Sequence, residues 1–294
     1  MLLGYNTNGL AHHDLLEAIE LLASIGYRSV AITVDHAALN PYAPGFERQL
    51  AKVQAALLNH GLQSVIETGA RFLLDPRKKH EPTLLSADPK GRARRVNFVK
   101  HAIDIAAVLQ SDCVSIWAGT AHDAKPPEDH WERLVEGLMQ VVAHAADRNV
   151  CIGFEPEPGM FIDTMARYRE LIGRLEGVGV PLDRFRLTLD VGHLHCQGEL
   201  PITDHIRTWA KSLVNVHLED MRHGVHEHLM FGDGEIDFPP VVAAFADVGY
   251  TGPLHVELSR HSHVGPTAAR QAYEFLRPLL AANKIPELRT AEHA

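Results

Sequence analysis

The chain has 294 residues, of which 46% are hydrophobic and 22% charged, and its formal net charge is −9. This length suits two ordinary domains or one closed barrel of about 250 residues. The acidic balance argues against nucleic acid as a partner, because phosphate-backbone affinity needs clustered Lys and Arg, and no apolar run approaches the roughly 20 residues of a membrane span.

Short β-rich segments alternate with amphipathic helical segments along the chain. The strands are expected near residues 2–6, 28–34, 62–68, 112–118, 150–156, 185–191, 213–219 and 252–258. Between them apolar residues recur every three or four positions, as in Leu15, Ile19, Leu22 and Ile25, which is the spacing of a core-facing helix. Eight strands alternating with about eight helices predict an α/β fold, and at this length a single (β/α)8 TIM barrel over residues 1–294.

Two segments depart from this alternation. Residues 70–92 form a long connection after the third strand, and loops of this length are usually functional or mobile. Its basic residues favour a solvated charged loop, with a grip on a substrate phosphate or carboxylate as the alternative; they are Arg71, Arg77, Lys78, Lys79 and His80. Residues 283–294 lack apolar periodicity and are expected to form a frayed tail.

Four ligand-type residues stand at the ends of the last four expected strands, namely Glu155, Asp190, His217 and Glu257. In each strand the residue two places earlier is small or polar, and the residue between is large and apolar. A strand alternates its side chains between two faces, so the four point to the same side. The carboxyl ends of barrel strands form the active face. The pattern therefore predicts ligands for one divalent ion: Mn²⁺, Mg²⁺, Co²⁺ or Zn²⁺.

The segments GFEPEPG, LDVGHLH, NVHLED, GYNTNGL and GDGEIDFPPVVAAFADVGYTGPLHVEL resemble the sugar phosphate isomerase/epimerase superfamily of xylose-isomerase-like barrels, over nearly the whole chain. This superfamily includes ketose 3-epimerases, hydroxypyruvate isomerase, inosose dehydratase and endonuclease IV. The resemblance implies that these four residues bind one divalent ion. It also implies an isomerase or epimerase of a small sugar or related polyhydroxy carbonyl compound that works through an enediolate. Glu155 and Glu257 would then act as base and acid, and His193 would polarise a substrate oxygen.

Further residues are expected to line the substrate pocket. Trp117 cannot ligate a metal and offers an apolar wall for a sugar ring. Arg222 and His223 both lie near the position of a family arginine. The remaining candidates are strand ends and loop residues: Glu67, Tyr5, Asn6, His36, His226 and His228.

A metal-dependent phosphodiester hydrolase is the second hypothesis. His226 and His228 in HEHLMFGDGEID resemble a metal-binding segment of the nuclease. The third and fourth strands, however, offer Glu67 and Trp117 where a multinuclear site needs imidazoles, so the favoured interpretation has both histidines contacting substrate. A dehydratase or lyase on the same site, and a non-catalytic sugar binder, are further alternatives.

The sequence also bears on compartment and partners. The N-terminus lacks the basic start and small-residue cleavage site of a signal peptide. Cys113, Cys151 and Cys196 are widely spaced with no pairing pattern, which predicts reduced thiols in the cytoplasm. A small sugar-like molecule is the expected partner, and homo-oligomer formation stays open.

Overall fold

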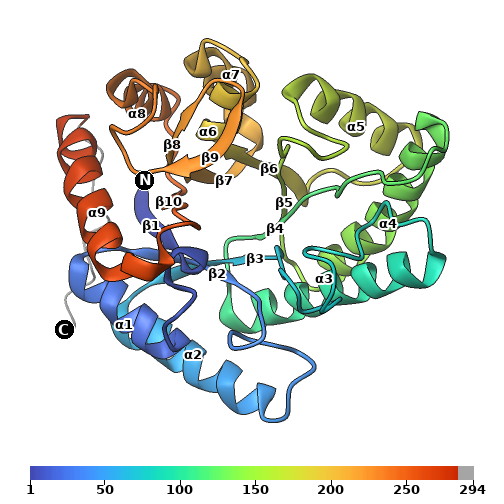
Figure 1. Ribbon diagram of the computed structural model, residues 1–294, viewed down its shortest axis with the longest axis horizontal. Coiled ribbons are helices and arrows are strands. Elements are labelled where there is room, and N and C mark those ends of the chain that lie inside the picture. The colour runs from blue at the N-terminus through green and yellow to red at the C-terminus, as the bar shows by residue number, and fades with distance from the viewer. Residues whose placement is uncertain (284–294) are drawn as a thin grey trace.

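Eight parallel strands close into a barrel in the order β1-β10-β7-β6-β5-β4-β3-β2, and helices surround it (Figure 1). The computed structural model describes residues 1–283. All eight strands lie within the expected ranges, which confirms the (β/α)8 barrel. They are β1 (Leu2–Asn6), β2 (Ser29–Thr33), β3 (Gln63–Glu67), β4 (Val114–Ile116), β5 (Ile152–Phe154), β6 (Phe185–Asp190), β7 (Leu213–Leu218) and β10 (Pro253–Val256).

The helices bury their apolar stripes against the outside of the barrel, as Leu15, Ile19 and Leu22 do in the first of them. The third helix begins at Pro89, within the connection that was expected over residues 70–92. Asp88 caps it and Pro89 occupies its first turn. The helices are α1 (Leu15–Ile25), α2 (Phe46–His60), α3 (Pro89–Leu109), α4 (Pro127–Asp147), α5 (Met165–Gly177), α6 (Val191–Cys196), α7 (Ile202–Trp209), α8 (Phe238–Asp247) and α9 (Gly265–Ala282), with short 3₁₀ turns η1 (Thr7–Leu10), η2 (Ala210–Ser212) and η3 (Ser262–Val264).

A hairpin that the sequence did not predict follows β7. Its strands, β8 (Asp220–Arg222) and β9 (Val225–Leu229), pair antiparallel and lie beside α6 (Figure 1). The buried carboxylate of Asp220 fixes the return of the chain, because it accepts hydrogen bonds from the backbone N–H groups of Gly232, Gly234 and Ile236 at 2.8–3.1 Å. The hairpin therefore holds its side chains over the barrel mouth on a well-bonded support.

The connection from residue 68 to residue 88 contains neither helix nor strand, as expected. Its apolar residues Leu73, Leu74, Leu84 and Leu85 are buried in the core, so the loop is anchored along its length. Within residues 1–283 no helix is both long and apolar enough to cross a membrane. All of the expected frayed tail except Asn283 lies outside the described residues.

Candidate metal centre

A polar cavity of about 430 Å³ opens at the carboxyl ends of the barrel strands. Three of the four ligand-type residues, Glu155, His217 and Glu257, belong to its wall. The wall also includes the ends of β1, β2 and β3, strand β9 and the segments that follow β1, β3, β4, β5 and β10. Among these residues are Asn6, Asn8, Thr33, Glu67, Arg71, Lys79, His80, Trp117, Glu157, His226, His228 and Arg260.

The carboxylates of three predicted ligands converge on a ring nitrogen of the fourth, His217. Nδ1 of His217 lies 3.0 Å from Oε1 of Glu155, 2.9 Å from Oε2 of Glu257 and 3.8 Å from Oδ2 of Asp190. One ligand atom from each residue lies within 4.8 Å of the others. They meet because each residue ends, or directly follows, one of four adjacent strands in the same phase of the alternation.

The donor atoms fit a divalent cation. Asp190 uses Oδ1 to cap α6, accepting from the His193 backbone N–H at 2.8 Å, while its buried Oδ2 has no hydrogen-bond partner among the described residues. The far nitrogen of His217, Nε2, lies 3.0 Å from Oε1 of Glu67. A carboxylate on the far nitrogen is the usual orienting partner of a metal-binding histidine. The site thus leaves an imidazole nitrogen and an unpaired carboxylate oxygen facing one point.

The pKa shifts of the predicted ligands also indicate a site for a cation. Burial raises the pKa of Glu155 to about 8, although the neighbouring His217 counteracts it. Burial alone would lower the pKa of His217, yet the carboxylates of Glu155, Glu67 and Glu257 raise it well above its ordinary value. Burial likewise opposes ionisation of Glu257, but the charge and hydrogen bond of His217 lower its pKa. In the absence of an ion, protons thus supply the positive charge that this cluster demands.

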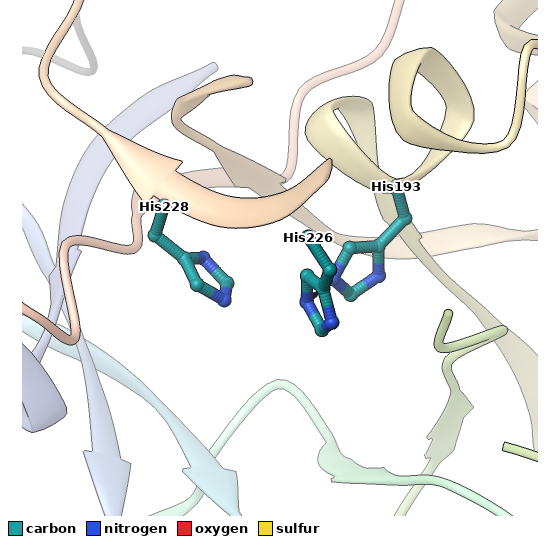
Figure 2. A group of neighbouring side chains, drawn as sticks. All are labelled: His193, His226 and His228. Atoms are coloured by element: carbon teal, nitrogen blue, oxygen red, sulfur yellow. Dashed lines mark hydrogen bonds between the residues drawn. The ribbon is translucent and has the colours of Figure 1, made fainter. Parts of the chain in front are cut away.

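A second group of donors, the imidazoles of His193, His226 and His228, lies next to the first. Figure 2 shows His193 projecting from α6 and the other two from β9. Nε2 of His193 lies 3.1 Å from Nε2 of His226, and the ring centroids of His226 and His228 are 5.2 Å apart. This group could also hold an ion by the spacing of its nitrogens. Nδ1–H of His193 donates to the carbonyl of Pro156 at 3.2 Å, so its Nε2 is an acceptor.

Two carboxylates, one half-buried and one fully buried, escaped the sequence prediction. Glu157 lines the cavity and has an oxygen within 4.8 Å of ligand atoms of Glu155 and His193. Glu219 is fully buried, and neither oxygen has a hydrogen-bond partner within residues 1–283. Each lies two residues beyond a predicted ligand, so the same alternation could have found both. A Cβ on Gly192 would lie 2.0 Å from Oε1 of Glu219, which explains the glycine there.

A polar chain inside the barrel supports the centre from below. The hydroxyl of Ser29 lies 2.9 Å from Nε2 of His255, whose Nδ1 lies 2.7 Å from Oδ1 of Asn215. Nδ2 of Asn215 in turn lies 3.1 Å from Nε2 of His217. Burial lowers the pKa of His255 well below its ordinary value, so this link of the chain is neutral. These contacts fix the imidazole of His217 from the barrel interior.

Trp117 forms part of the cavity wall, as expected, and it is held there by two cationic or aromatic neighbours. The guanidinium of the buried Arg95 lies 4.3 Å from the centroid of the Trp117 ring, and His80 packs edge-on against it at 5.6 Å. Arg95 also donates to the carbonyls of Thr68 and His80. It therefore joins the loop after β3 to the indole, a role that its place within a helix did not reveal.

Three other expectations need correction. Tyr5 is fully buried against Tyr27 outside the cavity, because alternation along β1 turns Asn6, its neighbour, toward the cavity. Arg222 is exposed and donates to the carbonyl of Asp233, so it is not part of the wall. His36 lines a second, adjoining cavity instead of this one. Of the loop cations, Arg77 and Lys78 are exposed, whereas Arg71, Lys79 and His80 line the main cavity.

Comparison with known proteins agrees with this architecture. A family model described as "Xylose isomerase-like TIM barrel" matches residues 19–279. The chain is 32% identical over 154 residues to an inosose dehydratase of Lacticaseibacillus casei, a match that covers 46% of this chain and 50% of that protein. The chain thus spans about half the length of this relative.

A longer match is to the L-ribulose-5-phosphate 3-epimerase of Escherichia coli, 23% identical over 256 residues, which cover 86% of this chain and 85% of that protein. Among solved structures, that of the IOLI protein with a binding zinc atom superimposes with a TM-score of 0.76 at 17% identity, over 96% of this chain and 99% of that one. At that identity the likeness concerns the fold.

Proposed function

The chain belongs to the xylose isomerase-like TIM barrel family, and from that premise we propose that it is a divalent-metal-dependent isomerase or epimerase of a small sugar or related polyhydroxy carbonyl compound. The observation that carries the proposal is the convergence of three carboxylates, those of Glu155 and Asp190 buried and that of Glu257 half-buried, on Nδ1 of His217. The epimerase relative acts on a ketose phosphate by its name, and the zinc atom bound by a structural relative supports a metal.

Glu155, Asp190, His217 and Glu257 would hold the ion. When bound, a divalent cation supplies Lewis-acid stabilisation of the negative charge that develops on adjacent substrate oxygens. Mn²⁺, Mg²⁺, Co²⁺ and Zn²⁺ all suit three carboxylates and one imidazole. Asp190 has no second duty besides the helix cap, so we assign it to ligation alone.

Glu155 and Glu257 would move the proton. They follow β5 and β10, which are separated by β6 and β7 around the barrel, so the two carboxylates reach a bound molecule from different sides. One would take the proton from the carbon beside the carbonyl, which gives an enediolate, and the other would return a proton to it. Return to the opposite face gives an epimer, and return to the neighbouring carbon gives an isomer.

His193 would orient the substrate. Because its Nδ1–H is committed to the Pro156 carbonyl, the ring presents Nε2 as an acceptor. It therefore suits a hydrogen bond from a substrate hydroxyl, whereas polarising a substrate oxygen, the role that the resemblance implied, would need a donor at Nε2. We assign Trp117 to the apolar face of the sugar, and Glu67, His226 and His228 to its polar edge.

The test is exchange of substrate C–H with solvent. The protein would be loaded with Mg²⁺ or Zn²⁺, which are diamagnetic and therefore suit NMR. It would be incubated in D₂O with D-fructose, L-ribulose and L-ribulose 5-phosphate, and the substrate C–H signals would be followed by NMR. The proposal expects deuterium at the carbon next to the carbonyl in at least one of them. Metal binding without exchange in any ketose would favour a non-catalytic binder, and loss of water would favour a dehydratase.

A phosphodiester hydrolase is the second candidate, favoured by the imidazole group of His193, His226 and His228. Metal stoichiometry separates the two. We predict one ion per chain by elemental analysis, unchanged in His228→Ala, because Glu67 and Trp117 stand where a multinuclear site needs imidazoles. Two or three ions per chain, with one lost in His228→Ala, would promote the hydrolase.

A further inference from the structure

A second cavity of about 280 Å³ adjoins the first at the same end of the barrel. Its wall comes from η1, the start of α1, the loop after β2 and the loop after β3. The two cavities share four lining residues, which are Asn8, Ala11, Thr33 and Arg71. A molecule bound at the candidate metal centre is therefore separated from the second cavity only by the side chains that line both.

This second cavity is mainly apolar, in contrast to the first. The side chains that give it this character are Leu10, Leu15, Ala18, Ala37, Ala38 and Phe72. Phe72 is 44% exposed on a loop whose neighbouring residues Leu73 and Leu74 are buried. A largely apolar hollow beside a few polar groups is the usual form of a small-molecule site. An aromatic ring left at the edge of such a hollow gains burial when a ligand occupies it.

The partition between the cavities is built from Asn8 and Arg71. Nδ2 of Asn8 donates to Oε1 of Glu257 at 2.8 Å, so this amide touches a candidate metal ligand on one side and the second cavity on the other. Arg71 donates to the carbonyl of Asn8 at 3.1 Å, and its other nitrogen lies 4.0 Å from Asp35. The side chain of Arg71 is 29% exposed, so a ligand that spans both cavities can displace it.

The charges of the second cavity do not suit a phosphate. Among the described residues that line it, Arg71 is the one Lys or Arg, and the carboxylate of Asp35 faces it from the same wall. His13 and His36 are the other lining residues whose side chains can take up a proton. A phosphate group carries up to two negative charges and is bound by several strong donors. An uncharged apolar group matches the wall better.

We propose that this second cavity is a substrate subsite for an apolar, ring-sized substituent. The substrate is then a polyhydroxy carbonyl compound that carries an aryl or bulky alkyl group, rather than a bare sugar or a sugar phosphate. An apolar cavity of about 150 Å³ is enough to hold benzene, and this one is larger. The sugar part of the inference rests on the proposed function; the apolar occupant rests on the second cavity alone.

The experiment compares three probes that share one ketose: D-fructose, D-fructose 6-phosphate and 6-O-benzyl-D-fructose. Binding to the metal-loaded protein is measured by calorimetry. We expect the benzyl ether to bind about 10- to 100-fold more tightly than fructose, as burial of one ring-sized apolar group predicts. The phosphate should show no such gain.

Ala38→Leu tests the location. Ala38 lines the second cavity and not the first, so the larger side chain should remove the gain for the benzyl ether and leave fructose binding unchanged. The matched control is Ala143→Leu on the exposed side of α4, which should change neither. Phe72→Ala, at a largely exposed position, should remove part of the gain.

A separate arm isolates the second cavity from catalysis. Crystals of metal-free protein are soaked with benzyl alcohol, and density is expected in the second cavity of the wild type but not of Ala38→Leu. If that holds while no ketose binds or exchanges, the proposed function fails and the apolar subsite stands. A gain for the phosphate instead of the benzyl ether, a gain that survives in Ala38→Leu, or absence of benzyl alcohol from the second cavity would each overturn the subsite.

Discussion

The two halves of the barrel mouth are built differently. On the side of β5, β6, β7 and β10, the four predicted metal ligands stand at the strand ends, buried or half-buried and with ligand atoms within 4.8 Å of one another. On the side of β1 to β4, loops supply most of the wall, and they enclose the second cavity. Strand ends are rigid and suit chemistry that needs fixed distances, whereas loops suit the selection of a substrate.

Glu67 links the two halves. It ends β3, on the loop-built side, yet its carboxylate lies 3.0 Å from Nε2 of His217 on the other. The two sides therefore contact each other, and they differ in the role that we assign to each. It makes a clear prediction: changes among the strand-end residues should alter metal binding and rate, and changes on the other side should alter substrate affinity.

The largest effect is expected from Glu257→Gln. The amide keeps an oxygen for the ion but cannot carry the proton, so the exchange of substrate C–H with D₂O should fall by about 10²–10⁴-fold while most of the metal is retained. The measurement is NMR of the exchanging ketose beside elemental analysis. Glu170→Gln, on the exposed face of α5, is the matched control. Undiminished exchange in Glu257→Gln would remove this residue from the chemistry.

Asp190→Ala should come next and act on the metal. It deletes the carboxylate oxygen that has no other partner among residues 1–283, and we expect affinity for Mn²⁺ to fall by at least about 100-fold, more than loss of an outer partner usually costs. It also removes the cap of α6, worth about 1 kcal/mol. Asp190→Asn can keep that cap while losing the charge. A fully occupied Asp190→Ala protein would contradict the assignment.

Metal affinity should change by at least about tenfold per pH unit below pH 8, because ligation releases a proton from Glu155. With its pKa raised to about 8, Glu155 carries a proton below that pH in the ion-free protein and must release it to ligate. The raised pKa of His217 acts in the same direction. Affinity should therefore rise as pH passes through the pKa of Glu155 at about 8, and level off only where His217 has also lost its proton. Calorimetry in buffers of different ionisation enthalpy counts the protons, and binding without proton release would contradict the electrostatic account.

The smallest effect on the reaction rate should come from Arg95→Leu, on the side of β1 to β4. Without its bonds to the carbonyls of Thr68 and His80, the wall at Trp117 loosens, and KM should rise about tenfold with kcat little changed. The free energy of unfolding should fall by about 2–3 kcal/mol. Arg95→Lys, which retains the charge, should recover part of both. A fall in kcat together with metal content would show that the two halves are not separable.

The direction of the four side chains at the ends of β5, β6, β7 and β10 could be predicted from the sequence, because alternation along a strand is a local pattern. Alternation along a strand fixes which way each side chain points, so the shared phase of Glu155, Asp190, His217 and Glu257 was readable without the fold. The same rule, applied further, would have added Glu157 and Glu219. It would also have kept Asn6 and removed Tyr5 from the candidates, because neighbouring residues of a strand face opposite sides.

The tertiary structure decided what depends on distance between segments. Closure of the barrel brings Glu67 to His217, 150 residues away in the chain, and α3 brings Arg95 to Trp117. The hairpin β8–β9 sets His226 beside His193, while packing of η1, α1 and the loops after β2 and β3 creates the second cavity. Periodicity records the direction of a side chain relative to its own backbone. It carries no information on which other segment that side chain will meet, since this depends on how strands close and loops pack.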